Sequence, residues 1–333
     1  MNKHLKFRRT RTAGIAVSIG LFASACSGVN SEEISAEGTP SVVAETATTT
    51  TIANTPTALA LTSAEGEGED TASRVSSNSV VVIEAGAEPL VELRLEPELG
   101  ARQLLVSQTQ TFSQAINGRD LGGASTQTIE SISSVDVGRD GDNFTIESIV
   151  ESMLVAPDTN PEIAELLNAA LAESVGLTTN SVVDDRGVLV QSSADGTDLA
   201  LDEALSSLSE VSNPLPAEAV GVGAVWETTQ TLAVLGFDVE QVTRTTITNI
   251  DGDVITLTIE GTQNVPVGSS VTSNGDVITV HAWDVDIEGT TVLDLGEAIP
   301  VEATTTTQTS QVLDIDGSII DQSLELELAS SSN

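Results

Sequence analysis

The residue types that most often carry nucleophilic or metal chemistry are scarce in this chain of 333 residues. It contains two histidines, His4 and His281, one cysteine, Cys26, and no lysine after Lys6. Serine and cysteine nucleophiles need a neighbouring base, and zinc needs several histidine or cysteine ligands. A Gly-x-Ser-x-Gly motif is also absent. We therefore predict that the protein is not an enzyme and uses no cofactor or metal, with a carboxylate-based hydrolase as the lesser alternative.

His281 lies in an alternating segment, Thr279–Ile287. Side chains of a strand alternate between its two faces, which would place His281 on the same face as Trp283 and Val285. We expect a partly buried, hydrogen-bonded histidine there rather than a catalytic base.

Asp284, Asp286 and Glu288 are spaced like the first ligands of a calcium loop. The motif then fails, because Leu295 stands where the bidentate glutamate belongs. We interpret the segment as an alternating strand, and weak calcium binding remains the alternative.

Cys26 is the residue with the clearest chemical role. Five basic and no acidic residues precede position 12, and an apolar or small-residue run fills 13–25, too short to span a membrane. The sequence Ala23-Ser24-Ala25-Cys26 resembles the lipobox of bacterial lipoproteins. That resemblance implies cleavage before Cys26, lipid (palmitate) on Cys26, and anchoring at the extracytoplasmic face of the cell membrane, or at the outer membrane of a cell with two. An ordinary signal peptide cleaved after Ala25 is the alternative.

Charge and aromatic content exclude several kinds of partner. After Cys26 there are seven arginines against 50 acidic residues, a net charge of −43. Such a field repels nucleic acid, so we predict no nucleic-acid partner. The chain has two tryptophans, five phenylalanines and no tyrosine, too few for a platform on which sugars or bases stack. An acidic, lysine-free surface is also typical of adaptation to salt.

Composition divides the chain into a signal peptide (1–25), a Ser/Thr/Glu-rich stalk predicted to be disordered (26–78) and a β-rich envelope domain (79–330). A faint repeat of Thr-, Ile- and Asp-Gly-containing motifs leaves a degenerate tandem duplication open. Strands are predicted at Val80–Ile83, Leu90–Leu95, Ser181–Val183 and Val188–Gln191. Turns between strands are predicted at six dipeptides, namely Asp140-Gly141, Arg186-Gly187, Asp251-Gly252, Asn274-Gly275, Glu288-Gly289 and Asp316-Gly317.

Two amphipathic helices interrupt the strands. The first follows the cap Asn160-Pro161 and ends at Gly176, and the second spans about Leu199 to Val211. We predict an α+β, mostly β fold, in which a large curved antiparallel sheet of ten or so strands carries both helices on its concave face. An apolar ligand between helices and sheet would contact the apolar face of the helices, or else the same residues fill the core: Ile163, Leu167, Leu171, Leu205 and Leu208.

Two short motifs add a second resemblance. Leu93–Gly100 ends a strand in Pro-x-x-Gly, and Pro216 is followed by Val222-Gly-x-x-Trp226. Both are similar to motifs of uncharacterised β-rich bacterial envelope lipoproteins, which resemble half-barrel lipid carriers. That group has no agreed activity to carry over. From the expected space between helices and sheet we predict a lipid-anchored, non-enzymatic binding protein whose partner is an apolar small molecule or an envelope protein. The alternative is a structural or protein-interaction module displayed on a stalk.

Overall fold

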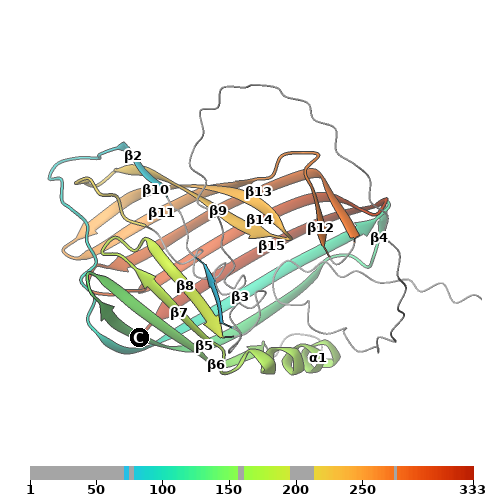
Figure 1. Cartoon of the computed structure of the whole chain (residues 1–333), viewed down its shortest axis with the longest axis horizontal. Coiled ribbons are helices and arrows are strands. Elements are labelled where there is room, and N and C mark those ends of the chain that lie inside the picture. The colour runs from blue at the N-terminus through green and yellow to red at the C-terminus, as the bar shows by residue number, and fades with distance from the viewer. Residues whose placement is uncertain (1–70, 75–78, 157–160, 196–213, 274–275) are drawn as a thin grey trace, which may run out of the picture.

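The computed structural model describes residues 71–74, 79–156, 161–195, 214–273 and 276–333, and within them fifteen strands form one antiparallel sheet (Figure 1). The strands are rich in Val, Ile and Thr, which suit a half-buried pleated surface. Their bounds are β1 (Thr71–Arg74), β2 (Ser79–Glu84), β3 (Gly100–Ile116), β4 (Arg119–Asp120), β5 (Ser125–Asp140), β6 (Asn143–Val155), β7 (Thr178–Val183), β8 (Leu189–Asp195), β9 (Val225–Val234), β10 (Phe237–Asp251), β11 (Val254–Asn264), β12 (Ser270–Ser273), β13 (Asp276–Asp294), β14 (Glu302–Ile315) and β15 (Ser318–Ser332).

The last strand lies in the middle of the sheet. The order is β1-β8-β7-β6-β5-β3-β15-β14-β13-β11-β10-β9-β2, with β4 beside β3 and β12 beside β13. β15 therefore joins the two halves of the chain by pairing with β3 on one side and β14 on the other. Strands β1 and β2 form the two edges, so the described sheet is not closed.

The predicted large antiparallel sheet is confirmed, with more strands than expected. The strands at Val80–Ile83, Ser181–Val183 and Val188–Gln191 correspond to β2, β7 and β8. The strand predicted at Leu90–Leu95 is wrong, because this segment makes a single bridge, between Val91 and Val220. Its alternation instead reflects a crossing segment that packs into the core, with Leu93 and Leu95 buried.

Four of the six predicted turns are confirmed by positive φ angles: Gly141 (62°), Gly187 (74°), Gly252 (63°) and the pair Asp316 (50°) and Gly317 (84°). Asn274-Gly275 lies outside the described residues. The turn predicted at Glu288-Gly289 is wrong, because β13 runs straight through it. Gly289 serves a close approach there, since a Cβ atom would lie 2.8 Å from the carbonyl oxygen of Thr304 on β14.

The first predicted helix is confirmed as α1 (Pro161–Leu171), which continues into the 3₁₀ turn η1 (Ala172–Ser174) and stops at Gly176, whose φ is 90°. The second, at about Leu199–Val211, lies outside the described residues, so only one short helix is described and the chain is mostly β. α1 contacts β6, and its Leu167 and Leu171 form a buried cluster with Ile129 and Val155.

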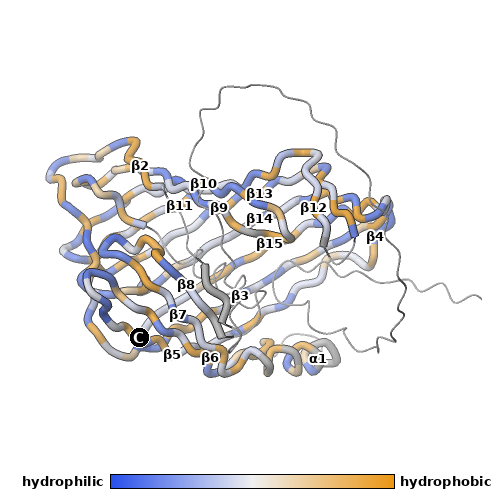
Figure 2. Tube along the Cα trace, in the orientation of Figure 1, coloured by the Kyte–Doolittle hydropathy of each residue, from blue (hydrophilic) through white to orange (hydrophobic). Residues whose placement is uncertain are grey.

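The inner face of the sheet is the face that carries Ile129, Trp226, Ile259 and Leu328, which are all buried. At one end, residues of β5, β6 and β7 cluster with residues of β9, β10 and β11, so the two wings of the sheet curl toward each other (Figure 1). Trp226 is fully buried in that cluster, and its indole Nε1 donates to the carbonyl oxygen of Pro214 at 3.0 Å. Orange and blue alternate along the strands at this end in Figure 2, as expected for strands with one buried face.

A second apolar cluster closes the other end of the inner face. Its buried members come from β10, β13, β14 and β15, with Val265 from the chain after β11. The middle of the inner face lies between these two filled ends.

Candidate functional site

Alternation sorts the side chains of the central strands by chemistry. On β13, Asp284, Asp286 and Glu288 are exposed, whereas Val285 and Ile287 between them are buried. On β15, Glu325 and Glu327 are exposed in the same way and flank the inner residue Leu326. The acidic charge of these strands thus lies outside, and the inner face is left to apolar and neutral polar side chains.

A row of neutral polar side chains crosses the inner face at one level. The strand register pairs Gln114 of β3 with Gln322 of β15, Gln322 with Gln311 of β14, and Gln311 with Trp283 of β13. Gln311 and Gln322 are 1% and 2% exposed, and Gln322 Nε2 donates to Gln311 Oε1 at 2.8 Å. We call these four residues the amide row.

Three buried polar atoms of the amide row have no hydrogen-bond partner in the described part of the chain: Gln114 Nε2, Gln322 Oε1 and Trp283 Nε1. Leaving a buried donor or acceptor unpaired costs about 1–3 kcal/mol. Buried polar groups of native proteins are almost always paired. Three of the five unpaired buried side-chain atoms of the described residues lie in this one row, and the other two are the hydroxyls of Thr305 and Ser330.

The rows beside the amide row differ in burial. On one side, Val280, Leu313 and Ile320 belong to the second apolar cluster and are buried. On the other side, Phe112 and Leu324 are only half-buried. Val285 of the same row is buried, so the amide row separates a closed apolar core from a row in which only Phe112 and Leu324 are partly open apolar side chains.

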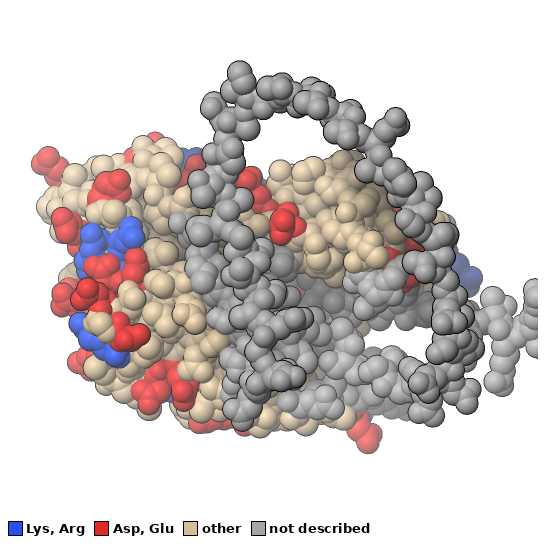
Figure 3. Space-filling model, viewed as in Figure 1, with Lys and Arg blue, Asp and Glu red and all other residues tan. Residues whose placement is uncertain are grey.

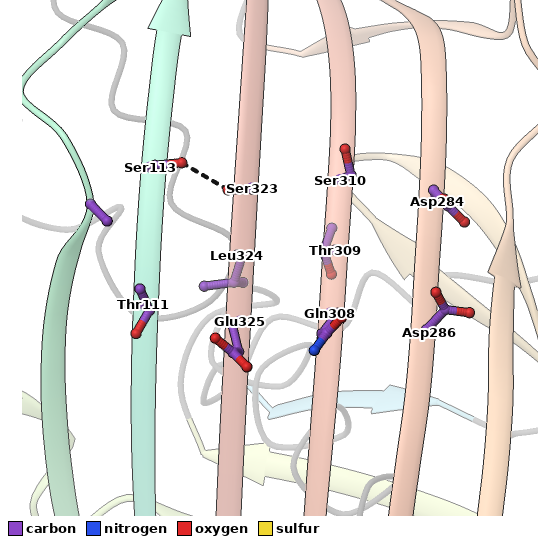
Figure 4. A pocket seen from close by; sticks show the side chains of 11 residues that line it. Thr111, Ser113, Asp284, Asp286, Gln308, Thr309, Ser310, Ser323, Leu324 and Glu325 are labelled. Atoms are coloured by element: carbon purple, nitrogen blue, oxygen red, sulfur yellow. Dashed lines mark hydrogen bonds between the residues drawn. The ribbon is translucent and has the colours of Figure 1, made fainter.

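The outer face of the same strands carries a hollow of about 410 Å³ (Figure 4). Two polar rows line it, and one, Asp284–Ser310–Ser323–Ser113, contains a hydrogen bond of 2.7 Å between the hydroxyls of Ser113 and Ser323. In Figure 4 the side chains of Leu324 and Thr309 point away from the viewer, toward the inner face. The second row comprises Asp286, Gln308, Glu325 and Thr111.

The acidic side chains of the hollow alternate along straight strands. The strand interpretation of Asp284–Glu288 is thus confirmed. Among the described residues, no three histidine, cysteine or acidic side chains lie close enough together to hold a metal ion. The hollow presents hydroxyls, amides and carboxylates to solvent.

His281 does not lie where alternation predicted. The register between β13 and β14 shifts between Val280 and Ala282, so His281 occupies a bulge and is exposed, with half of its side chain open to solvent. Its Nε2 lies 3.8 Å from Asp314 Oδ2. The prediction of a partly buried His281 beside Trp283 is therefore wrong, because the bulge inserts one residue and turns the His281 side chain away from the inner face.

Arginines of the described chain pair with carboxylates at one end of the sheet, where Figure 3 shows basic and acidic side chains together. Arg94 Nε lies 3.3 Å from Asp185 Oδ2, and Arg186 donates to Asp184 Oδ2 at 3.1 Å. Arg102 is paired with Glu297. The Arg94–Asp185 pair joins the crossing segment of Leu93 and Leu95 to the chain between β7 and β8, and the Arg102–Glu297 pair joins β3 to the chain after β13.

The predicted ligand-lining residues are only partly described. Leu167 and Leu171 are buried against β5 and β6. The side chain of Ile163 and all of Leu205, Leu208 and the predicted anchor Cys26 lie outside the described residues. Contact with a ligand stays a prediction for this set.

Sequence reasoning missed the amide row. Its signal is weak, since glutamines at positions 108, 110 and 114 alternate along β3, β14 carries Gln308 as well as Gln311, and Gln322 stands alone in β15. Only the register brings Gln114 beside Gln322, more than 200 positions away.

No helix in the described part of the chain is long and apolar enough to cross a membrane. No known protein family matches the chain, and no curated protein matches it either.

Proposed function

We propose that the protein is a non-enzymatic binding protein of the cell envelope, lipid-anchored through Cys26 at the extracytoplasmic face of a membrane, that holds the apolar part of a ligand on its inner face. The observation that supports the ligand most directly is the contrast along the inner face. Both ends are filled by buried clusters, while Phe112, Leu324 and Leu326 between them are half-buried. A ligand that covers half-buried apolar side chains is bound more favourably by about 25 cal/mol for each Å² of apolar surface removed from water.

The anchor is tested by growing cells with a fatty-acid probe and comparing the native chain with Cys26→Ala. The proposal expects label on the native chain and none on the variant. Equal labelling of the two forms would show that the anchor is elsewhere or absent.

The ligand is tested on the exported Cys26→Ala protein, which carries no anchor lipid to confuse the measurement. Extraction with organic solvent and mass spectrometry should recover an apolar molecule, and the emptied protein should bind the neutral fluorophore N-phenyl-1-naphthylamine. Leu324→Gln should weaken this binding several-fold, because it places an amide on the half-buried strip.

Ser323→Gln is the matched control, since it makes the same side chain on the outer face one residue earlier. Neither extractable ligand nor bound fluorophore, or equal binding by the two variants, would contradict an inner-face site.

The outer hollow favours a second function, contact with another envelope component by a module displayed on a stalk. Its exposed Asp284, Asp286 and Glu325 suit a polar partner surface. Crosslinking in whole cells from a photoreactive residue at Gln308 would capture a single partner on this account, and none if the hollow is merely solvated.

A further inference from the structure

We infer that the amide row binds the uncharged polar head of an amphiphilic ligand whose tail lies on the half-buried strip of Phe112, Leu324 and Leu326. This inference rests on the proposed inner-face site and names the class of ligand that the site would take.

The open positions of the row define what the head must offer. Gln114 Nε2 and Trp283 Nε1 are donors without acceptors, and Gln322 Oε1 is an acceptor without a donor. A small rotation would let Gln114 donate to its paired neighbour Gln322. Trp283 Nε1 has no acceptor in the described part of the chain, although Gln311 Oε1, which accepts from Gln322, belongs to the adjacent residue of the row. A ligand with a carbonyl or hydroxyl oxygen would satisfy the indole, and a hydroxyl would satisfy the free Gln322 oxygen.

We infer a neutral ligand head from the absence of charged side chains in the two inner rows that would contact it. The amide row carries no charged side chain, and neither does the adjacent inner row of Phe112, Leu324, Thr309 and Val285. A phosphate, carboxylate or ammonium group there would be buried without a counter-charge, which is far more costly than burying a hydroxyl or an ester. The acidic residues of these strands face the other side of the sheet, so they offer no compensation to a buried cation.

The spacing of the rows fits a head joined directly to a chain. Successive inner-face rows lie about 7 Å apart, because each strand residue advances about 3.4 Å. Leu324 and Leu326 follow Gln322 on the same face of β15, so an alkyl chain leaving the amide row meets apolar side chains within one row. On the opposite side of the amide row, Val280, Leu313 and Ile320 are packed in the second apolar cluster. The alkyl chain of the ligand can therefore leave the amide row only toward Leu324.

The test compares four probes that share one oleyl chain and differ in the head: monooleoylglycerol, oleate, oleylamine and the headless alkene. Each displaces N-phenyl-1-naphthylamine from the Cys26→Ala protein. We expect monooleoylglycerol to bind at least about tenfold more tightly than oleate or oleylamine, the ratio that a free-energy difference of about 1.4 kcal/mol gives. Equal or tighter binding of oleate or oleylamine would overturn the inference.

Two variants locate the head. Trp283→Phe removes the indole donor while keeping an aromatic ring beside Phe237, whose centroid lies 6.3 Å from that of Trp283. Gln322→Leu removes the amide. Either should weaken monooleoylglycerol several-fold and leave the alkene unchanged, whereas Gln308→Leu on the outer face should change neither.

The outcomes separate this inference from the function beneath it. If Trp283→Phe and Gln322→Leu leave monooleoylglycerol unaffected while Leu324→Gln still weakens every probe, the head is not at the amide row but the inner-face site stands. If no probe displaces the fluorophore, the inner-face site itself fails. Circular dichroism and thermal melting show whether each variant is folded. If Gln322→Leu does not fold, Trp283→Phe, which keeps an aromatic ring at this position, still tests the amide row.

Discussion

At the scale of single residues, Asp276 and Asp316 bring two acidic groups together at one end of β13. Asp316 Oδ1 accepts a hydrogen bond from the backbone nitrogen of Val277 at 3.1 Å, which fixes its carboxyl group beside Asp276. A side-chain hydrogen bond with Asp316, followed by repulsion from its charge, raises the pKa of Asp276 above the ordinary value of 3.8. The folded protein therefore holds a proton here that the unfolded chain would release.

This arrangement predicts how Asp276→Asn changes stability with pH. Because the folded state binds more protons, its stability falls as pH rises from the ordinary carboxyl pKa through the raised one. Asp276→Asn removes the repulsion, so it should raise the melting temperature at neutral pH and leave it unchanged well below the ordinary pKa. Thermal melts across this pH range check the sign, with Asp238→Asn, an exposed carboxylate on β10, as control. If Asp276→Asn melts at a lower temperature than the native protein at neutral pH, the two carboxyl groups do not repel each other as proposed.

At the scale of elements, hairpins and α1 could be predicted because their signals are local. Asp316-Gly317 supplies two consecutive positive φ angles, and Pro161 opens α1, whose following 3₁₀ turn stops two residues before Gly176. The amide row could not be predicted, because it depends on which strands are neighbours. His281 was misplaced for a related reason, since a one-residue bulge reverses the face of a side chain and alternation carries no mark of it.

The Leu90–Leu95 segment shows a second limit of periodicity, because its alternation predicted burial correctly and strand pairing wrongly. Its alternation is real, because Leu93 and Leu95 are buried, yet the backbone bonds of the segment go to separate parts of the chain. Leu95 donates to Asp185 and Glu96 donates to Leu295. An extended segment that crosses between elements has the same one-sided burial as a strand, so a period of two predicts burial more securely than it predicts sheet pairing.

The short helix offers a prediction that separates core from ligand contact. Leu171 is 2% exposed and packs with Ile129, Val155 and Leu167. Truncation of such a residue leaves a cavity, so Leu171→Ala should lower the free energy of unfolding by about 2–4 kcal/mol. Binding of N-phenyl-1-naphthylamine to the folded variant should not change. Urea unfolding and probe titration measure the two, with Leu154→Ala, an exposed leucine on β6, as control. Weakened binding with little loss of stability would instead support the predicted lining role of α1.

At the scale of the whole molecule, the sheet is assembled from contacts that are distant in sequence. β15 pairs with β3 across about 200 residues, and the first apolar cluster joins strands from both halves of the chain. Neither half can complete its side of the sheet without the final strand, since β3 and β14 would both lose a neighbour. The sorting of charge is likewise a property of the assembled sheet, because the central strands β13 and β15 place their carboxylates at alternate positions and leave the middle of the inner face neutral.

That sorting concentrates negative charge on one outer surface, and stability should therefore depend on salt. Glu260 and Glu288 are direct cross-strand partners on β11 and β13, and like charges in this position are destabilising. Raising ionic strength from about 0.1 M to about 1 M shortens the Debye length from about 10 Å to about 3 Å, which screens repulsion between exposed charges. The melting temperature should rise over this range in both sodium chloride and choline chloride, because screening does not depend on the cation.

Glu288→Gln tests whether the effect comes from this surface. The variant should melt higher than the native protein at low salt and gain less from added salt, whereas Glu218→Gln, an exposed residue outside the strands, should keep the native slope. A gain with sodium but not choline would indicate specific cation binding instead of screening, and a melting temperature independent of salt would show that the outer carboxylates are too well solvated to oppose the fold.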